Sequence, residues 1–255
     1  MSKSISTDRE LWKQVYQYYM IDQKPLEWIA DILGYSPDAV SKLRETLGMP
    51  ARTKQYLFNS LAMTMFTEEQ EQIIFGGILG DGYIQDRDSR NPIYSETHSV
   101  YQLEYLDWKA RKLYPFISKT GKPYVGHKGT QAQIKSVALP QLRFYRGVFY
   151  RDGKSKIFPV EALEWLDDLA VAVWFMDDGS FSKASGQIKL ATCSFNIGTV
   201  GMLQGWLATK YKVLCTIQTS NGLYPTLVVQ KSSNERFFNL VEPHVIPSMR
   251  YKLGQ

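Results

Sequence analysis

The chain has 255 residues, 44% of them hydrophobic, which is enough for one large domain or two to three small ones. Lys and Arg outnumber Asp and Glu by 30 to 25, and this positive excess suits a polyanionic partner such as nucleic acid or a membrane surface. No apolar run approaches the roughly 20 residues of a membrane span, and residues 1–9 lack the apolar core of a signal peptide. We therefore expect no membrane segment and no secretion signal, and a soluble protein of the cytoplasm.

The two cysteines and three histidines give no indication of a disulfide framework or a metal site. Cys193 and Cys215 lack metal-ligand spacing, and their apolar or β-branched surroundings predict buried free thiols. The histidines, His98, His127 and His244, are scattered along the chain. We expect neither a histidine nucleophile nor a histidine metal site.

Residues 1–52 predict a small all-helical domain. Pro25 and Gly34 bound one helix, and Ser36 with Pro37 begins a second that runs to residue 47. The pair resembles a helix-turn-helix, with small Ala30 at the helix contact, and in the DNA-binding form of this motif the second helix enters the major groove. The alternative is a helical bundle used only for packing. In the DNA-binding interpretation the second helix exposes the polar residues Asp38, Ser41, Lys42, Arg44 and Glu45, and we expect DNA contacts from Ser41, Lys42 and Arg44.

After a linker over residues 53–66, one order of elements occurs twice. In the first half, residues 67–150, the pattern predicts a helix over 67–80, strands over 83–85 and 94–100, a helix over 102–116, strands over 123–127 and 131–137, and a helix over 140–149. In the second half, residues 151–255, it predicts a helix over 160–177, strands over 180–183 and 187–194, a helix over 197–211, strands over 213–219 and 226–231, and a helix over 235–241. We therefore predict a duplicated α+β fold with pseudo-twofold symmetry and an antiparallel sheet in each half.

Each half has a helix that ends in an Asp-Gly pair, and Asp178 follows Asp81 by 97 residues. The first helix contains Gly76, Gly77 and Gly80, each about 1 kcal/mol less favourable in a helix than Ala, which indicates a close approach of another backbone. Ala172 can serve the same purpose in the second helix. Two such helices side by side would make Asp81 and Asp178 neighbours.

Two carboxylates at the negative ends of two helix dipoles repel each other, so they need a cation. Oxygen ligands suit Mg²⁺, and carboxylate-held Mg²⁺ beside a basic surface is typical of phosphodiester hydrolysis. The alternative is that each Asp-Gly pair only forms a turn. Two copies at equivalent places in a duplicated unit favour a functional site.

The segments over residues 74–82 and 171–179 resemble the two motifs of the single-chain, intron-encoded LAGLIDADG homing endonucleases. The eighth motif position is Asp in both copies, Asp81 and Asp178, although the letters just before them depart from the family's pattern. The resemblance covers about residues 65–255 and includes the sequences Trp-Phe-Met-Asp-Asp-Gly at 174–179 and Ile-Pro-Ser-Met-Arg-Tyr-Lys-Leu at 246–253.

The resemblance implies αββαββα halves whose saddle-like sheets lie along the DNA major groove. It implies a monomer that cuts both strands of a long, largely asymmetric double-stranded DNA target. It also implies Mg²⁺ or Mn²⁺ held by Asp81 and Asp178, with Gly80 and Asp177 beside them at the metal site. One basic residue per half is expected near the metal, and Lys156 and Lys252 match, since they follow the two aspartates by 75 and 74 residues. Most lysines are only solvated surface, and Lys154 could take the place of Lys156.

DNA contacts are expected from outward-facing polar residues of the strands, because long polar side chains read base edges and basic ones neutralise phosphates. The candidates are Gln85, Arg87, Arg90, Lys128, Gln133 and Lys135 in the first half and Lys183, Gln187, Lys189, Gln218 and Lys231 in the second.

Two other functions remain open. Some members of the family are maturases that assist the splicing of their host intron RNA, and the scaffold can also serve a DNA-binding regulator that does not cut. The presence of both aspartates and both lysines favours a DNA endonuclease over the regulator.

Overall fold

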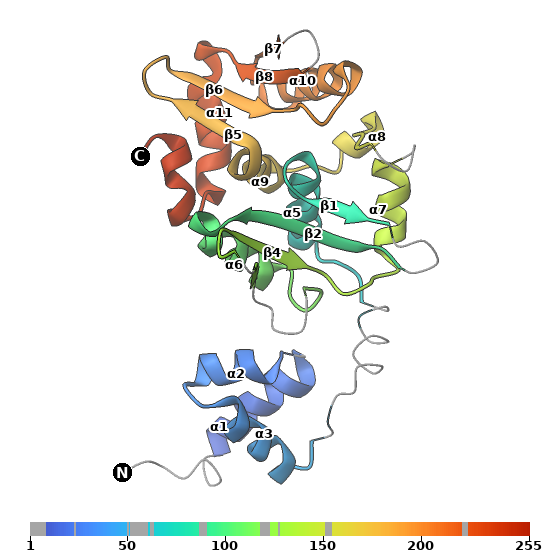
Figure 1. The fold of residues 1–255 in the computed structure, drawn as a ribbon, viewed down its shortest axis with the longest axis vertical. Helices are drawn as coiled ribbons and strands as arrows, with labels where there is room; N and C mark the ends of the chain where they lie inside the picture. The colour runs from blue at the N-terminus through green and yellow to red at the C-terminus, as the bar shows by residue number, and fades with distance from the viewer. Residues whose placement is uncertain are drawn as a thin grey trace.

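A computed structural model describes residues 9–22, 24–49, 51, 61, 64–86, 91–117, 123–126, 128–150, 155–220 and 224–255. Two helices, α5 (Glu68–Leu79) and α9 (Asp168–Asp178), pack against each other at the centre of the main body (Figure 1). A capping box between Thr67 and Gln70 begins α5, and the Asp167 side chain accepts a hydrogen bond from the Ala170 amide at the start of α9.

The contact between these helices depends on Gly76. A Cβ atom at this position would clash with the backbone carbonyl of Ala170 and the side chain of Val173. The close approach expected from the glycines is therefore confirmed. Val173 is the side chain of α9 that meets Gly76, and the part assigned to Ala172 in this approach stays a prediction.

Each motif helix leads into a four-stranded antiparallel sheet. The first sheet has the order β1 (Tyr83–Gln85), β2 (Ile93–Ser99), β4 (Gln131–Lys135), β3 (Tyr124–Val125). The second has the same order, β5 (Gly179–Ser182), β6 (Gln187–Ala191), β8 (Tyr224–Val229), β7 (Cys215–Ser220). The registers also correspond, since Ile84 pairs with Tyr94 and Phe181 pairs with Ile188. The predicted α+β fold with two antiparallel sheets related by a pseudo-twofold axis is confirmed.

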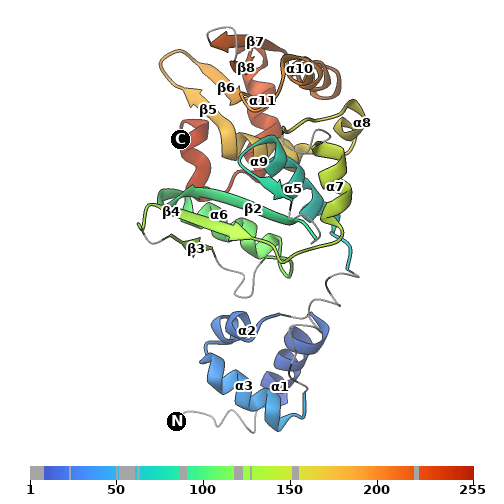
Figure 2. The same cartoon turned by 45° about the vertical axis from the view of Figure 1, so that its right-hand side comes forward.

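The remaining helices complete the repeat. The first half contains η3 (Val100–Gln102), α6 (Leu103–Lys112) and α7 (Leu142–Phe149). The second contains α10 (Ile197–Tyr211), η4 (Lys231–Ser233), α11 (Asn234–Val241), η5 (Glu242–His244) and the 3-10 helix η6 (Pro247–Leu253). Helices α6 and α11 lie on opposite sides of the α5–α9 pair (Figures 1 and 2).

The single helix predicted over 160–177 is in fact two, α8 (Val160–Leu163) and α9. The Gln72 side chain explains the break, because its amide donates to the Trp165 carbonyl at 2.7 Å and its oxygen accepts from the Asp167 amide at 2.9 Å. These backbone groups bond to α5 instead of continuing a helix. No helix in the described part of the chain is both long and apolar enough to cross a membrane.

The N-terminal helices form a core of their own. This unit contains α1 (Arg9–Tyr16), the π-helix η2 (Gln17–Ile21), α2 (Leu26–Leu33) and α3 (Pro37–Thr46). Gly34 ends α2 in the left-handed region at φ 72°, and Ser36 caps α3 as the sequence predicts. Both views place the unit beyond the first sheet, on the side away from the second half (Figures 1 and 2). The boundary at residue 52 lies outside the described residues.

Both cysteines are free thiols, as predicted, but only Cys215 is buried. Burial raises the pKa of the Cys215 thiol to about 12. The prediction of burial was wrong for Cys193, because β6 ends at Ala191 and Cys193 lies in the exposed turn beyond it.

Candidate active site

Asp81 and Asp178 lie at the adjoining C-terminal ends of α5 and α9, as the sequence predicts. The two ends touch, since the Asp81 amide lies 3.4 Å from the Asp177 carboxylate and a Cβ atom on Gly80 would clash with Asp177. The Asp81 side chain is 40% exposed. Burial, and then the negative charge of Asp81, raise the pKa of Asp178 to about 6. The two carboxylates therefore repel each other at an accessible place.

Lys156 and Lys252 occupy equivalent positions beside these aspartates. The Lys156 ammonium donates a 2.7 Å hydrogen bond to the carbonyl of Gly80, and the Lys252 ammonium donates a 2.7 Å hydrogen bond to the carbonyl of Asp177. Each carbonyl belongs to the residue just before the motif aspartate. Burial lowers the pKa of both lysines. The matched spacing in the sequence therefore corresponds to a matched geometry, and the two half-buried cations lie close to the paired carboxylates.

The donor set at this site fits a divalent cation. Two repelling carboxylates, with backbone carbonyls next to them, are the hard oxygen ligands that Mg²⁺ and Mn²⁺ accept. The Asp177 carboxylate is different, because it is buried and bonded to Tyr105 and Lys109, each at 2.7 Å. The roles at the metal predicted for Gly80 and Asp177 remain predictions.

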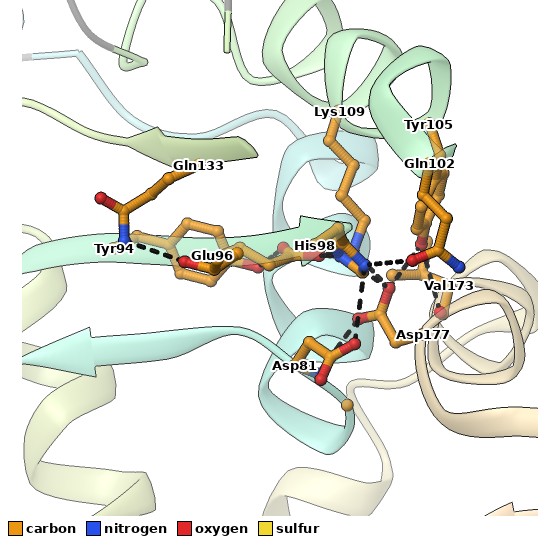
Figure 3. Close-up of polar contacts among 12 residues, drawn as sticks. Asp81, Tyr94, Glu96, His98, Gln102, Tyr105, Lys109, Gln133, Val173 and Asp177 are labelled. Atoms are coloured by element: carbon orange, nitrogen blue, oxygen red, sulfur yellow. Dashed lines mark hydrogen bonds and ion pairs between the residues drawn. The ribbon is translucent and has the colours of Figure 1, made fainter. Parts of the chain in front are cut away.

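A buried polar network, which the sequence did not predict, lies directly behind the site (Figure 3). The buried Lys109 ammonium lies between the carboxylates of Glu96 and Asp177. The ring Nε2 of His98 lies 2.6 Å from Glu96, and its Nδ1 lies 3.7 Å from the Asp81 carboxylate. Ligand atoms of Asp81, His98 and Asp177 all lie within 4.8 Å of one another, so this trio could also hold a metal. His98 thus lies in a group that could hold a metal, although the sequence indicated no histidine metal site.

A signal for this network was present in the repeat. Residues on the core side of β2 should be apolar, but Glu96 and His98 alternate with the outward residues Ser95 and Thr97. β2 is therefore polar on both faces, and its inner face meets the buried Lys109 of the next helix. This pattern indicates a group of charges inside the core. Comparison with the inner face of β6, which is apolar at Ile188 and Leu190, would have identified it.

The predicted DNA-contacting residues lie mostly on the outer faces of the sheets or in adjoining turns. The residues that lie within strands and face outward are Gln85, Gln133, Lys135, Gln187, Lys189 and Gln218. Lys128 is exposed in the turn before β4, and Lys183 lies one residue beyond β5. Lys231 was predicted on a strand but begins η4, because β8 ends at Val229. Arg87, Arg90 and Lys154 fall outside the described residues.

On α3, Lys42 is exposed and Ser41 is half-buried, but the prediction that Arg44 is exposed was wrong. Arg44 lies four residues after the core residue Val40, so it shares the inner face of the helix. Its guanidinium donates to the Met49 carbonyl, just beyond the end of α3, at 2.7 Å. The predicted DNA contact of Arg44 stays a prediction, which its burial disfavours.

The model of the LAGLIDADG DNA endonuclease family matches residues 71–237, which include both motif helices and both sheets. The N-terminal helices lie outside the match. In three-dimensional structure the chain is similar to the homing endonuclease I-WcaI bound to its DNA recognition sequence, with a TM-score of 0.68 and 23% identity over 82% of this chain and 96% of that chain. At this identity the likeness shows the fold alone.

Several curated proteins are similar in sequence. A RecA protein of Mycobacterium shimoidei is 30% identical over 204 residues, which cover 74% of this chain and 47% of that protein. This chain thus spans about half the length of the RecA relatives it matches. A probable intron-encoded endonuclease 1 of Wickerhamomyces canadensis is 27% identical over 231 residues, covering 82% and 94% of the two chains. The cytochrome b mRNA maturase bI2 of Debaryomyces hansenii is 28% identical over 202 residues, covering 73% and 74%.

Proposed function

Because the chain belongs to the LAGLIDADG DNA endonuclease family, we propose that it is a site-specific endonuclease that hydrolyses one phosphodiester bond in each strand of double-stranded DNA. One observation carries the proposal. Each motif helix ends in an accessible aspartate, and the carbonyl just before each aspartate is bonded to a half-buried lysine at the same distance of 2.7 Å. A fold retained only as a scaffold would have no need for this repeated arrangement.

Asp81 and Asp178 would hold Mg²⁺ or Mn²⁺, with Gly80 and Asp177 next to them. The bound ion would polarise the scissile phosphate and lower the pKa of an attacking water. Lys156 and Lys252 place positive charge where the phosphate gains negative charge in the transition state. Their bonds to the motif carbonyls fix both ammonium groups before DNA arrives, so little reorganisation is needed during the reaction.

The sheets would bind the duplex. Their outer faces carry long polar side chains such as Gln85, Gln133 and Gln187, together with the basic residues Lys135 and Lys189. Such side chains read base edges in the major groove, and the lysines neutralise phosphates. Because the two sheets carry different residues at equivalent places, the target is asymmetric, and both halves of the enzyme are supplied by one monomer.

The N-terminal helical unit would add contacts at the end of the target bound by the first sheet. Its position beyond that sheet supports this, and Lys42 and Ser41 are the accessible polar groups on α3. Deletion of residues 1–60 should weaken binding of duplex and leave the cut position unchanged. A moved cut would contradict this division of roles.

The second candidate function is that of a maturase, which one relative favours because it is named as an mRNA maturase. A structured intron RNA would then compete with duplex DNA for this chain. The third candidate, a regulator that does not cut, predicts binding of DNA without cleavage.

A randomised pool of DNA can reveal cleavage and the target sequence in one experiment. Linear duplexes with a randomised central segment are incubated with the protein and Mg²⁺, and the cut ends are captured and sequenced. We expect one long asymmetric site, cut in both strands, and no cutting when EDTA removes the metal. If the folded protein enriches a duplex by binding but cuts no member of the pool, the endonuclease proposal is wrong.

A further inference from the structure

Among the residues that the structure describes, the network behind the active site is found in only one of the two halves. In the first half Glu96 and His98 face inward from β2, and Lys109 faces them from α6. The strand registers identify the equivalent positions in the second half as Leu190 for Glu96 and Thr192 for His98.

The helices agree with this assignment. Lys109 lies six residues after the first residue of α6, and Leu203 lies six residues after the first residue of α10. Both side chains are fully buried. The second half thus fills the same space with side chains that carry no charge.

A buried group of charges is not needed to hold this fold together. Burying an ion pair costs solvation free energy that its attraction barely recovers, and apolar side chains of similar volume are often as stable. The second half of the same molecule packs apolar or uncharged side chains at the equivalent positions. The charged side chains of the first half therefore point to a role at the site next to them.

The network contacts the two centres differently. His98 faces Asp81 directly, with Nδ1 3.7 Å from the carboxylate. On the other side the direct bonds of the network go to a neighbour of Asp178, since Lys109 and Tyr105 bond to the carboxylate of Asp177. Thr192, the equivalent of His98, donates its hydroxyl to the Pro225 carbonyl at 2.7 Å instead.

The His98 ring is held in place on both edges. Its Nε2 lies 2.6 Å from Glu96 and its Nδ1 lies 3.1 Å from the Gln102 side-chain oxygen. The His98 ring lies between Glu96 and Gln102 (Figure 3). The Gln102 amide in turn donates to the Tyr251 hydroxyl at 2.9 Å, in the helix that carries Lys252. A ring fixed in this way presents one constant edge to Asp81.

We propose that His98 is a positioning residue for Asp81, and that the one-sided network makes the centre at Asp81 chemically different from the centre at Asp178, so that the two DNA strands are cut at unequal rates. This inference rests on the proposed endonuclease function. It assigns to His98 a role that Thr192 does not have.

The test measures the cleavage rate of each strand separately. A duplex recovered from the randomised pool carries a different fluorophore on each strand, and the rates are followed with Mg²⁺ for the parent chain, His98→Ala, His98→Gln and the matched control Thr192→Ala. His98→Ala should fold, because Glu96 keeps Lys109 and the Tyr94 hydroxyl, at 2.6 Å, as partners. Thermal unfolding and duplex binding in Ca²⁺ verify the fold of each variant.

We expect His98→Ala to change the ratio of the two strand rates by about tenfold or more, because a small displacement of a reacting group costs up to about 100-fold in rate. His98→Gln, which keeps an N–H donor, should restore part of the ratio, and Thr192→Ala should leave it unchanged.

Equal slowing of both strands by His98→Ala, or an equal change of ratio by Thr192→Ala, would overturn the inference while the endonuclease function stands. If His98→Ala does not fold, His98→Gln decides alone. A strand ratio in folded His98→Gln that differs from the parental ratio, with an unchanged ratio in Thr192→Ala, supports the inference, whereas a parental ratio in His98→Gln or equal slowing of both strands overturns it. A parent chain that cuts no duplex would overturn the endonuclease function itself.

Discussion

Lys156 and Lys252 are related by the duplication of the chain, and each donates a 2.7 Å hydrogen bond to the carbonyl that precedes a motif aspartate. The elements that carry them differ, since Lys252 belongs to η6 and Lys156 lies in an irregular segment before α8. Two different backbone conformations thus place a lysine ammonium group at equivalent positions beside the motif aspartates. This indicates that the position of the ammonium group is important for function.

Replacement of either lysine by Met should reduce cleavage while the duplex is still bound. A positioned group that assists proton transfer or stabilises charge contributes about 100-fold or more to the rate. Single-turnover rates with Mg²⁺ measure the loss, and binding in Ca²⁺ measures what remains. Lys112→Met is the control, because Lys112 pairs only with Glu69 at the surface in the described contacts. Equal cleavage rates in Lys112→Met and Lys156→Met would show that Lys156 does not contribute to catalysis.

Metal binding should weaken as the pH falls through about 6. The pKa of Asp178 is raised to about 6 by burial and by the charge of Asp81, so its carboxylate is ionised above this pH and protonated below it. A cation requires the ionised form, so affinity is present at higher pH and lost at lower pH. Titration with Mn²⁺, followed by its paramagnetic effect on water relaxation, gives the affinity at each pH.

The control for this pH dependence is Asp178→Asn, which should bind Mn²⁺ weakly at every pH on both sides of about 6. An affinity of the parent chain that is unchanged across this range would show that Asp178 does not hold the ion.

Loss of the Lys109 charge should destabilise the protein strongly. Lys109→Met leaves Glu96 and Asp177 buried without their shared cation, which costs about 3–5 kcal/mol in the free energy of unfolding. On the same helix, Lys112→Met should cost less than about 1 kcal/mol, because the pair with Glu69 is exposed. Urea unfolding of both variants makes the comparison, and similar costs would place Lys109 outside any buried pair.

The close contact of the motif helices can be tested at Gly76. A Cβ atom there meets the Ala170 carbonyl and Val173, so Gly76→Ala should destabilise the fold by about 1–3 kcal/mol. Gly205 lies in α10 with nothing within 4 Å of an added Cβ, so Gly205→Ala should be neutral or stabilise by up to about 1 kcal/mol. A change of the same sign in the free energy of unfolding of both variants would contradict the packing described for α5 and α9.

Much of this architecture could be predicted from the sequence, because the signals are local or repeated. The Asp-Gly pairs recur once in each half, the two lysines follow them at nearly equal spacings, and the glycines of the first motif helix indicate a close contact, and the structure places these groups together. Helix ends such as Gly34 and Ser36 are set by neighbouring residues and were also predicted.

What the sequence did not reveal depends on contacts between distant residues. His98 lies at the site because the inner face of β2 reaches α5, where Tyr94 and Glu96 lie close to Gly77, and because Lys109 offsets the charge of Glu96. The polar inner face of β2 is a local signal, but neighbouring residues do not reveal which groups it meets. The helix break before Asp167 is likewise caused by Gln72, which lies 95 residues away in sequence. Arg44 was misplaced because its helix face was judged by its charge and not by its spacing from Val40.

The central claim is that Asp81 and Asp178 together support hydrolysis of both strands, and the most direct test is the cleavage of a selected duplex by Asp81→Asn and Asp178→Asn. Each change keeps the shape of the side chain and removes the charge that would hold the metal. We predict that neither variant cuts either strand with Mg²⁺ and that both still bind the duplex in Ca²⁺. Cleavage of both strands at the parental rate by either variant would contradict the account.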